Sequence, residues 1–596
     1  MAKTETIRHS LSHILALAVK ELYPKVKFGI GPAIENGFYY DFDFSKVSEL
    51  QQKKIQQDKK QRSKKEPEKV GLSLKDLPKI EKRMKELIKK DLKFEKKIVS
   101  KSEAKKIFKD QPYKLELIDE IEEKNVSLYK SGEFLDLCRG PHVKSSGEIP
   151  ADGFKLTRVA GSYWKGNENK PMLTRIYGVS FQTKKELDMY LEAQKEAEKR
   201  DHRVLGKKLE IFMLDEEVGQ GLPLWLPKGA TLRRLIENYL YQELKGAGYQ
   251  WVVTPHIGRL KLWKTSGHWE LYRENMYSPI EIDEEKYLIK PMNCPFHVKI
   301  YQSKIRSYKD LPVKYAELGT VYRYERSGTL HGLTRVRGFT QDDAHIWSTP
   351  EQLNDELTKL LKHGLKMLRD FGFKDFVIYL STRPAKFAGT EKGWEKATNS
   401  LKYVLKKLKL DYQIDPGGGV FYGPKIDIKI KDSLGREWQC TTIQVDFNLP
   451  EKFNITYIDK RGKKVQPIMI HRALLGSLER FIGVLLEHYM GSLPLWLAPI
   501  QCLVIPVGKS HRKYAEDIAE KLKNQGLRAE ARTEAETVSK KIREGEIQKI
   551  PYLLVVGDKE IKKKTIRVRQ REKGDIGETK LTNFLKKIKL EIENKK

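Results

Sequence analysis

The stretch TVYRYERSGTLHGLTRVRGFTQDDAHIW, residues 320–347, decides the fold. It predicts two β-strands joined by a polar loop, with Val321, Arg323 and Glu325 on one face of the first strand. In the second strand, strict alternation puts six side chains on one side: Arg335, Arg337, Phe339, Gln341, Asp343 and His345. Burying such a face in an apolar core would cost a large desolvation energy, so we expect it to face water or a charged ligand. A solvated sheet face is the alternative, although Thr, Lys and Glu are more usual there.

The composition indicates an intracellular protein with a polyanionic partner. A chain of 596 residues predicts about three to five domains. The formal charge of +33 favours nucleic acid as a partner, although a lysine-rich proteome would give the same bias. Four scattered cysteines (Cys138, Cys294, Cys440 and Cys502) without a framework spacing indicate a reducing cytoplasm. The sequence shows neither a signal peptide nor an apolar run of the ~20 residues that span a bilayer, so we expect a soluble cytoplasmic protein.

Histidines near the start of the chain form a first candidate site. Residues 5–23 predict a helix whose apolar stripe lies roughly opposite His9 and His13, so we do not expect these two histidines in the core. Cys138 and His142, in DLCRGPH, have the same four-residue spacing. The four side chains could form a metal quartet or an acid–base cluster around a water, and solvated histidines are the alternative.

Cys294 in KPMNCPFH, His345 at the end of the polar strand, and His471 in IMIHRALLGS form a second candidate set. They lie far apart in the sequence, so their spacing gives no zinc signature.

Arg323-Tyr324-Glu325, followed by a loop and RVRGFTQDDAH at 335–345, resembles motif 2 of class II aminoacyl-tRNA synthetases, and most closely that of the threonyl-tRNA synthetase family. The resemblance runs, with gaps, through essentially the whole chain. It implies an α+β multidomain fold with four parts: an α+β editing domain at 1–182, a linker helix at 183–205, a class II antiparallel-sheet catalytic domain at 206–497, and an α/β anticodon-binding domain at 498–596. A helix at 231–246 and a strand ending at Pro255 resemble motif 1, which implies a homodimer.

The same resemblance implies ATP-dependent activation of L-threonine and its transfer to the 3′ end of tRNA(Thr). For ATP it implies contacts from Arg323, Glu325, Arg335, Gln439, Thr442 and Arg480, with Mg²⁺ on the phosphates. For threonine it implies Gln341, Asp343, Tyr422, Lys425 and Gln444. Arg323, Arg480, Gln341 and His268 are the implied catalytic residues. Arginine suits the phosphate roles because its planar fork binds oxygens bidentately and keeps its charge.

Cys294, His345 and His471 coincide with the ligands of the zinc ion that is typical of this family. Three protein ligands leave an open position, which the amino and hydroxyl groups of threonine can occupy. Valine has the same shape without the hydroxyl, so a metal site rejects it where an apolar pocket could not. Phe296 stands where a small residue is expected in NCPxH, and Thr441 stands where glycine is expected after Cys440. We expect Cys440 to be buried and not a ligand.

RHSLSH, GPAIENGFYYDF and LDLCRGPHV resemble the editing domain of the family, which hydrolyses serine attached to the tRNA in a pocket regarded as metal-free. The implied lining is His9, His13, Tyr40, Lys114, Asp136, Cys138 and His142. A second hydrolytic site is needed because a pocket for threonine loses only ~1–3 kcal/mol on the missing methyl of serine. Members usually carry a ubiquitin-like domain before this one, and we expect that module to be missing here.

Two further regions are implied to touch tRNA. The last hundred residues alternate strands and helices, which predicts an α/β domain with a mixed sheet. There the resemblance implies that Glu560 and Arg569 read anticodon bases, with Ala535 standing where a base-contacting Asn is expected. Residues 51–110 carry 22 Lys/Arg against 10 Asp/Glu, which indicates solvated helical hairpins or direct tRNA contact.

Two other readings remain open. A non-catalytic tRNA-binding or regulatory paralogue would be expected to lose Arg323, Arg480 or a zinc ligand, and all are present. A class II enzyme for another amino acid, such as proline or serine, is disfavoured by the Cys–His–His set and by the editing module.

Overall fold

The computed structural model describes residues 3–45, 72–167, 169–432 and 435–595. The chain divides into two compact units, Met1–Lys195 and Glu196–Lys596. The predicted domain boundaries at 182, 205 and 497 stay predictions. None of the helices in the described ranges combines the length and the apolarity that crossing a bilayer needs.

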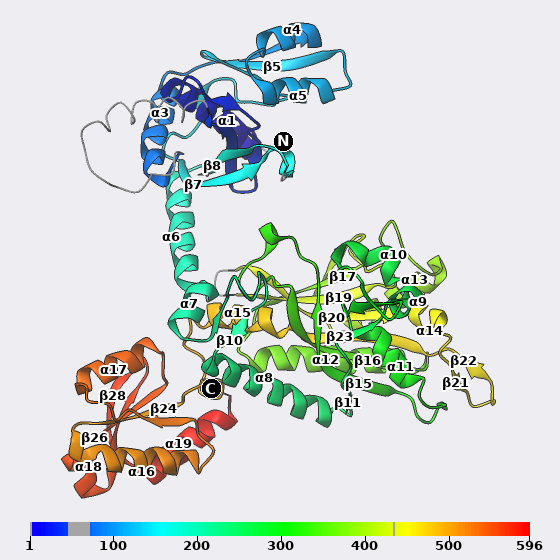
Figure 1. Cartoon of the computed structure of the whole chain (residues 1–596), viewed down its shortest axis with the longest axis vertical. Helices are drawn as coiled ribbons and strands as arrows, with labels where there is room; N and C mark the ends of the chain where they lie inside the picture. The colour runs from blue at the N-terminus through cyan, green and yellow to red at the C-terminus, as the bar shows by residue number, and fades with distance from the viewer. Residues whose placement is uncertain (1–2, 46–71, 168, 433–434, 596) are drawn as a thin grey trace. The chain divides into compact units, whose positions relative to one another are not determined.

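The first unit packs a long helix, α1 (Lys3–Leu22), against strands of two sheets (Figure 1). The larger sheet has the order β1-β3-β8-β7, with β2 paired to β3, and the smaller has the order β4-β5-β6. Their strands are β1 (Lys27–Phe28), β2 (Ala33–Ile34), β3 (Gly37–Asp43), β4 (Phe94–Ser100), β5 (Asn125–Ser131), β6 (Phe134–Leu137), β7 (Phe154–Tyr163) and β8 (Met172–Ser180). The other helices are α3 (Leu77–Lys89), α4 (Lys101–Ile107) and α5 (Pro112–Glu120).

Two predictions about this unit are wrong. His13 is a core histidine, only 1% exposed, because Phe94 and Phe134 cover the face of α1 that the sequence left open. The lysine-rich segment 51–110 does not form helical hairpins in its described part, residues 72–110. There β4 follows α3 and pairs with β5 in a sheet. Residues 51–71 of that segment lie outside the described residues.

The second unit is built on an eight-stranded sheet in the order β11-β15-β16-β23-β20-β19-β17-β18 (Figure 1). The interior pairs are antiparallel, and only the two edge pairs are parallel. The strands are β11 (Gln250–Trp251), β15 (Val313–Tyr322), β16 (Gly338–Ser348), β17 (Phe376–Ser381), β18 (Gln413–Asp415), β19 (Lys425–Lys431), β20 (Glu437–Asp446) and β23 (Ile468–Ser477). The predicted α+β class with an antiparallel catalytic sheet is confirmed.

The quoted stretch forms the predicted hairpin, but its strands are shorter than expected. β15 ends at Tyr322 and β16 begins at Gly338, so the arginines of the motif lie in the connecting loop. The reason is a competing partner: the Arg337 N–H donates to Gly221 O at 2.8 Å instead of continuing the ladder. Alternation holds from Phe339 to Asp343, whose side chains are half-buried. His345 is buried, against our expectation, because it faces a neighbouring cluster of side chains.

Helices cover the sheet and form one large core. α8 (Pro227–Gly246) buries Leu232, Ile236, Leu240 and Leu244 at a four-residue spacing, and it begins earlier than predicted because Pro227 suits a first turn. The strand after it stops at Trp251, before Pro255. The core also takes residues from α12 (Leu353–Asp370), α13 (Glu391–Lys407) and α15 (Leu478–His488). The remaining elements of this region are β9 (Phe212–Met213), β10 (Leu224–Trp225), β12 (Ile257–Arg259), α9 (Leu260–Ser266), α10 (His268–Tyr272), β13 (Ile280–Ile282), β14 (Glu285–Ile289), α11 (Cys294–Tyr301), α14 (Asn448–Lys452), β21 (Tyr457–Ile458) and β22 (Lys464–Val465).

The predicted single linker helix is wrong, because it is two helices. α6 (Lys184–Arg200) ends before Asp201, and α7 (His202–Lys208) begins after it. The Asp201 side chain accepts a hydrogen bond from the Arg203 N–H, which caps α7 and ends the first helix.

The C-terminal region is the predicted α/β fold with a mixed sheet, in the order β25-β24-β26-β27-β28. The first three strands of that order are parallel and the last two join antiparallel. Its elements are β24 (Cys502–Pro506), α16 (Arg512–Lys523), β25 (Ala529–Ala531), α17 (Val538–Ile547), β26 (Tyr552–Val556), α18 (Asp558–Lys563), β27 (Thr565–Gln570), β28 (Gly574–Lys580) and α19 (Leu581–Glu593). The sequence did not predict α18 or β28.

Candidate functional site

Sheet register brings the second candidate set together. His345 on β16 and His471 on β23 are direct cross-strand partners, and Gln444 on β20 is the partner of His471 on its other side. Side chains at such positions stand about 4.5–5.5 Å apart at Cβ. Cys294, the first residue of α11, completes the group, and one ligand atom from each of the three lies within 4.8 Å of the others.

Carboxylates behind the imidazoles fix where the protons sit. His471 Nε2 lies 2.8 Å from Asp446 Oδ2, which can only accept, so Nε2 carries the proton and Nδ1 does not. His297 Nε2 lies 3.0 Å from Glu317 in the same way, which makes its Nδ1 the acceptor for His345 Nδ1 at 2.8 Å. The nitrogens left without a proton, His345 Nε2 and His471 Nδ1, face each other at 3.0 Å.

Two lone pairs pointing at each other beside a thiol fit a soft divalent cation. Cysteine and histidine are the ligands that zinc prefers, and imidazoles backed by carboxylates are the usual form. Burial, and then the neighbouring histidines, hold the pKa of His345 well below its ordinary value, so the ring is neutral. Burial raises the pKa of Cys294, and a bound dication would favour its thiolate. The donor set therefore fits zinc.

Predicted threonine contacts surround this cluster. The Tyr422 hydroxyl donates to Gln444 Oε1 at 2.7 Å, and its ring lies 5.0 Å from that of His471. Asp343 accepts from Asn293 Nδ2 at 3.0 Å. Gln341 is half-buried on the same strand as Asp343.

The side chain at position 296 packs against α9. The Phe296 ring packs against Trp263 with 5.7 Å between ring centroids. The larger residue at this position therefore adds packing between α11 and α9.

Predicted ATP contacts gather in the loop between β15 and β16 and on α15. Arg323 lies over Tyr272 and Phe339, and its Nε donates to Pro291 O at 3.3 Å. Arg335 pairs with Glu325 at 3.0 Å. Burial lowers the pKa of Arg480, and the like charges of Arg323 and Arg335 add to that effect. Like-charged guanidinium groups repel one another, so this set of arginines suits a bound anion.

Asp427, which the sequence reasoning missed, organises the remaining contacts. Its carboxylate accepts from Gln439 and Thr442 at 2.8 Å each and pairs with Lys425 at 2.6 Å. Lys425, predicted to contact threonine, is therefore held by a carboxylate. A period-two reading of KIDI would have put Lys425 and Asp427 on one face.

Three other predicted positions are buried. His268 lies next to the rings of Phe421 and Tyr422, and its Nδ1 contacts Ser266 Oγ at 2.7 Å. Burial lowers the pKa of His268 to about 3. Cys440 is buried as predicted and stands outside the metal-type clusters found among the described residues. The Thr441 hydroxyl donates to Leu474 O at 2.7 Å, so the threonine is accommodated by β23.

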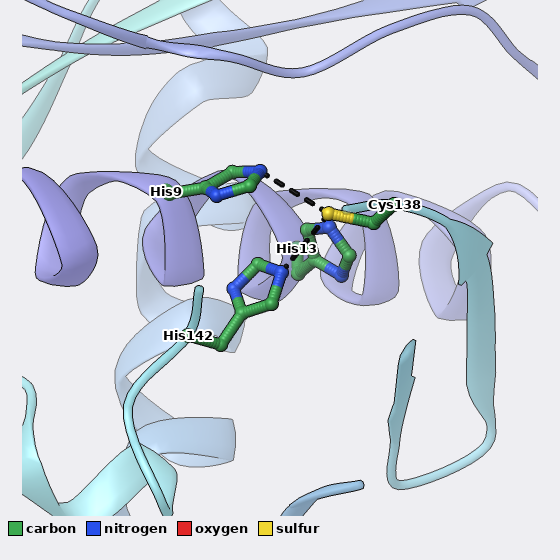
Figure 2. Close-up of side chains that lie close together, drawn as sticks. All are labelled: His9, His13, Cys138 and His142. Atoms are coloured by element: carbon green, nitrogen blue, oxygen red, sulfur yellow. Dashed lines mark hydrogen bonds between the residues drawn. The ribbon is translucent and has the colours of Figure 1, made fainter. Parts of the chain in front are cut away.

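The first candidate set also assembles, in the first unit (Figure 2). Cys138 Sγ lies 3.3 Å from His9 Nε2 and 3.2 Å from His142 Nε2. Burial lowers the pKa of all three histidines of the set, with the effect largest at His13 and His142, and raises that of Cys138 to about 11. At neutral pH the cluster is therefore three uncharged imidazoles around a thiol.

A buried polar group lies next to that cluster. Lys114 pairs with Asp136, which also accepts from the Tyr40 hydroxyl at 2.6 Å. The same carboxylate stands 3.7 Å from His13 Nε2. All seven predicted lining residues of this site thus belong to one group of neighbouring side chains.

The predicted anticodon contacts are not gathered in this way. Glu560 is largely buried and accepts from the Gly557 N–H at 2.9 Å, so one of its oxygens caps α18. Arg569 lies 3.5 Å from Glu546. Ala535 lines a hollow with Lys509, Arg512 and Lys540. Base reading by Glu560 and Arg569 stays a prediction.

Comparison with known proteins places three family models on the chain. The model described as "tRNA synthetase class II core domain (G, H, P, S and T)" matches residues 277–489. "Anticodon binding domain" matches residues 501–591. "Threonyl and Alanyl tRNA synthetase second additional domain" matches residues 126–177.

Relatives match over almost the whole chain. The threonine–tRNA ligase of Aquifex aeolicus (strain VF5) is 51% identical, over 99% of this chain and 90% of that protein. The threonine–tRNA ligase of Borreliella afzelii (strain PKo) is 48% identical, over 99% and 97%. A solved structure described as the RNA binding domain of threonyl-tRNA synthetase from Cryptosporidium parvum Iowa II is 40% identical, with a TM-score of 0.63 over 65% of this chain and 98% of that one. A prolyl-tRNA synthetase from Giardia lamblia, 20% identical with a TM-score of 0.54 over 68% and 80%, shares the fold.

Proposed function

The chain belongs to the threonine–tRNA ligase family of class II aminoacyl-tRNA synthetases, and from that premise we propose how its residues carry out the reaction. It activates L-threonine with ATP, transfers it to the 3′ end of tRNA(Thr), and hydrolyses Ser-tRNA(Thr). The observation that carries the proposal is the convergence of Cys294, His345 and His471, with two imidazole lone pairs directed at one point.

Zinc held by these three residues would act as a Lewis acid that binds the amino and hydroxyl groups of threonine. Asp343, which Asn293 holds by a hydrogen bond, would accept a hydrogen bond from the same amino group of the substrate. The Tyr422–Gln444 pair closes the pocket around the side chain. Because the pocket requires a hydroxyl, valine should be rejected by about 10⁴-fold or more.

ATP, accompanied by Mg²⁺ as is general for class II enzymes, would lie across the arginines of the loop and of α15. Arg323 is suited to the α-phosphate and Arg480 to the γ-phosphate, since both present guanidinium groups with few carboxylate partners. Gln341 holds the adenylate, and Gln439 and Thr442 support its nucleoside. In the reaction, the threonine carboxylate attacks the α-phosphorus and pyrophosphate leaves; catalysis is alignment plus charge neutralisation.

Editing would take place at His9, His13, Cys138 and His142. The imidazoles are uncharged at neutral pH, so their free nitrogens can accept a hydrogen bond from an attacking water and orient it. The Lys114–Asp136–Tyr40 group would receive the serine ester.

The chain is proposed to work as a cytoplasmic homodimer. Exposed apolar side chains near the end of α8, Tyr241 and Val253 among them, support a subunit contact there. Sedimentation of the purified protein tests this assembly, and a monomer at micromolar concentration would refute it.

ATP–pyrophosphate exchange with threonine, serine, proline and valine, run beside a zinc assay, tests the main proposal. We expect one zinc per chain, rapid exchange with threonine, and negligible exchange with valine and proline. Protein without zinc, or equal exchange with valine, would refute the zinc site. A preparation that leaves Ser-tRNA(Thr) intact would refute editing.

A further inference from the structure

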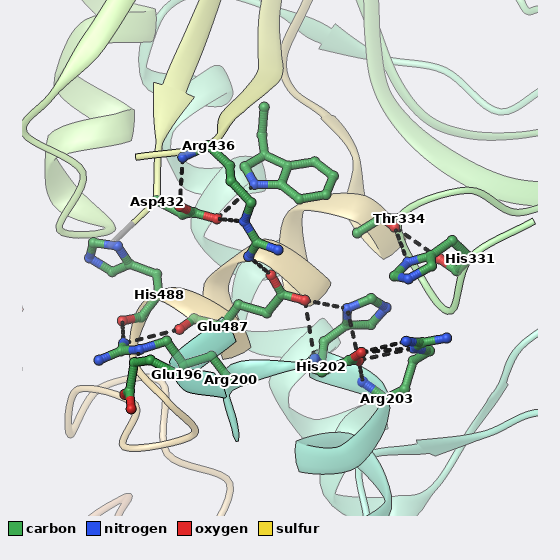
Figure 3. Close-up of polar contacts among 12 residues, drawn as sticks. Glu196, Arg200, His202, Arg203, His331, Thr334, Asp432, Arg436, Glu487 and His488 are labelled. Carbon is green, nitrogen blue, oxygen red and sulfur yellow. Dashed lines mark hydrogen bonds and ion pairs between the residues drawn. The ribbon is translucent and has the colours of Figure 1, made fainter. Parts of the chain in front are cut away.

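Glu487, a buried carboxylate on α15, belongs to a hydrogen-bond network whose members come from distant parts of the chain. Glu487 Oε1 accepts from the His202 backbone N–H at 3.2 Å and from His202 Nδ1 at 2.7 Å. Its other oxygen pairs with Arg436. Figure 3 shows Glu487 of α15 between His202 of α7 and Arg436, with Asp432 next to Arg436 and His331 beside His202.

The contacts fix the tautomer of His202. Nε2 lies 2.9 Å from the Leu333 backbone nitrogen, which can only donate, so Nε2 carries no proton. Nδ1 must then carry the proton and donate it to Glu487. The fully buried imidazole thus donates on one side and accepts on the other, and protonating it would break the bond to Leu333.

The loop is pressed against this imidazole. Gly332 has a φ of +49°, and a Cβ there would come within 2.1 Å of His202 Nε2. A side chain at 332 would therefore be both strained and obstructed. Only glycine lets the Leu333 N–H reach the histidine.

From Leu333 the connection reaches the proposed phosphate contacts directly. The next residue, Thr334, accepts through its carbonyl from Arg480 Nε at 3.0 Å. Arg335 follows, and its N–H donates to His331 O at 3.2 Å, which closes the turn. The backbone N–H that His202 holds and the carbonyl that holds Arg480 thus belong to adjacent residues, Leu333 and Thr334.

A second branch leads to β20. Arg436 Nε donates to Asp432 at 2.7 Å, and the same carboxylate accepts from Trp438 Nε1 at 3.0 Å. Trp438 precedes Gln439, one of the proposed ATP contacts.

We propose that His202, through its bond to Leu333, is a positioning residue for ATP: it fixes the Thr334 carbonyl that orients Arg480. Because His202 is the first residue of α7, that helix is also a structural part of the proposed ATP site. The proposal rests on the proposed function, since it assumes that Arg480 binds phosphate.

Two near-isosteric variants test the two hydrogen bonds of His202 separately, the one from Leu333 and the one to Glu487. In His202→Gln the amide oxygen can stand where Nε2 was and accept from Leu333; in His202→Asn the amide nitrogen can stand where Nδ1 was and donate to Glu487. We expect His202→Asn to weaken ATP binding by roughly 10-fold, because a buried N–H loses its acceptor. His202→Gln should stay within about 3-fold of the parent chain.

The measurements are the Kd of Mg·ATP by calorimetry on the full chain, and the KM values for ATP and threonine in exchange. We expect His202→Asn to raise the KM for ATP and leave both the KM for threonine and the hydrolysis of Ser-tRNA(Thr) unchanged. His363→Asn is the matched control, because His363 also contacts a carboxylate, Glu243 at 3.2 Å, away from the loop.

Equal ATP affinity in His202→Asn and the parent chain, or equal losses in the Asn and Gln variants, would overturn the proposal. If His202→Asn does not fold, Gly332→Ala breaks the same contact from the loop, and parent-like ATP binding there would overturn it too. Calorimetry needs no amino acid, so a failure of the threonine assignment would appear separately, in the exchange assay.

Discussion

The two Cys/His clusters contain the same residue types and differ in what stands behind them. In the Cys294 cluster both imidazoles are backed by carboxylates, Asp446 directly and Glu317 through His297. In the Cys138 cluster the Nδ1 atom of His142 meets only the hydroxyl of Ser10, at 3.2 Å. His13 Nδ1 has no hydrogen-bond partner among the described residues.

This difference teaches which chemistry each cluster suits. A carboxylate behind an imidazole fixes its proton outward and makes the inner nitrogen a better metal donor. In the Cys138 cluster the nearest carboxylate, Asp136, stands 3.7 Å from His13 Nε2, beyond hydrogen-bond distance, so an imidazole nitrogen there can contact a water, as a hydrolytic site requires. Under the proposed function, the same residue types would serve substrate selection in the Cys294 cluster and hydrolysis in the Cys138 cluster.

The largest effect should come from Cys294→Ala. Loss of a direct ligand should abolish stoichiometric zinc binding. Removing a residue that only supports a ligand costs about 10–100-fold, so threonine-dependent exchange should fall by more than that. Metal analysis and exchange kinetics measure this. Cys440→Ala, which removes another buried thiol, is the control and should keep both the bound zinc and the exchange activity. A full complement of zinc in Cys294→Ala would contradict the assignment of the metal to the Cys294 cluster.

His13→Asn should abolish editing without affecting activation. Removing a proton acceptor costs typically about 10²–10⁴-fold, so hydrolysis of Ser-tRNA(Thr) should fall by at least about 100-fold. Exchange with threonine should be unchanged, because His13 belongs to the first unit. An equal loss in both assays would mean that the variant disturbs the whole chain.

Asp446→Asn tests the role of the carboxylate itself. The amide oxygen can still cap the Asn448 and Leu449 N–H groups, so α14 should survive. We expect zinc affinity to fall by about 10–100-fold in a chelator competition. Ser10→Ala, which removes the corresponding partner in the other cluster, should leave zinc content unchanged.

The smallest effect should be that of pH on editing. Burial keeps the pKa of His13 and His142 well below the ordinary value of about 6.5, so these bases stay uncharged as the pH falls from 8 to about 5.5. Single-turnover deacylation should then be flat across that range after subtraction of spontaneous hydrolysis. An inflection near 6.5 would reveal an ordinary, solvated histidine. Stability should fall below about pH 6.5, since the unfolded chain binds protons that the folded one does not.

Much of the catalytic site could be predicted from period-two alternation. It placed Gln341, Asp343 and His345 on one face, and the register then joined His345 to His471. The same rule could have found Asp446, which shares a face with Thr442 and Gln444. Cys294 came only from the family resemblance, because nothing local links α11 to the sheet.

Other features could not be predicted because distant segments decide them. β16 starts late because Gly221 takes the Arg337 N–H. His13 is buried because β4 and β6 cover α1. The segments that cause these differences are distant in sequence from the elements they affect, so local sequence patterns could not predict them.

The interruption at Asp201 has a consequence for engineering. An unbroken helix would transmit every added or deleted residue as a rotation of about 100° to whatever follows. Here α7 begins anew at the Asp201 cap, so its orientation does not depend on the number of residues in α6. Hydrogen bonds to Glu487 and from Leu333 also hold His202 in place. A foreign module grafted upstream of Glu196 should therefore leave the synthetic site in register, whatever the length of the graft.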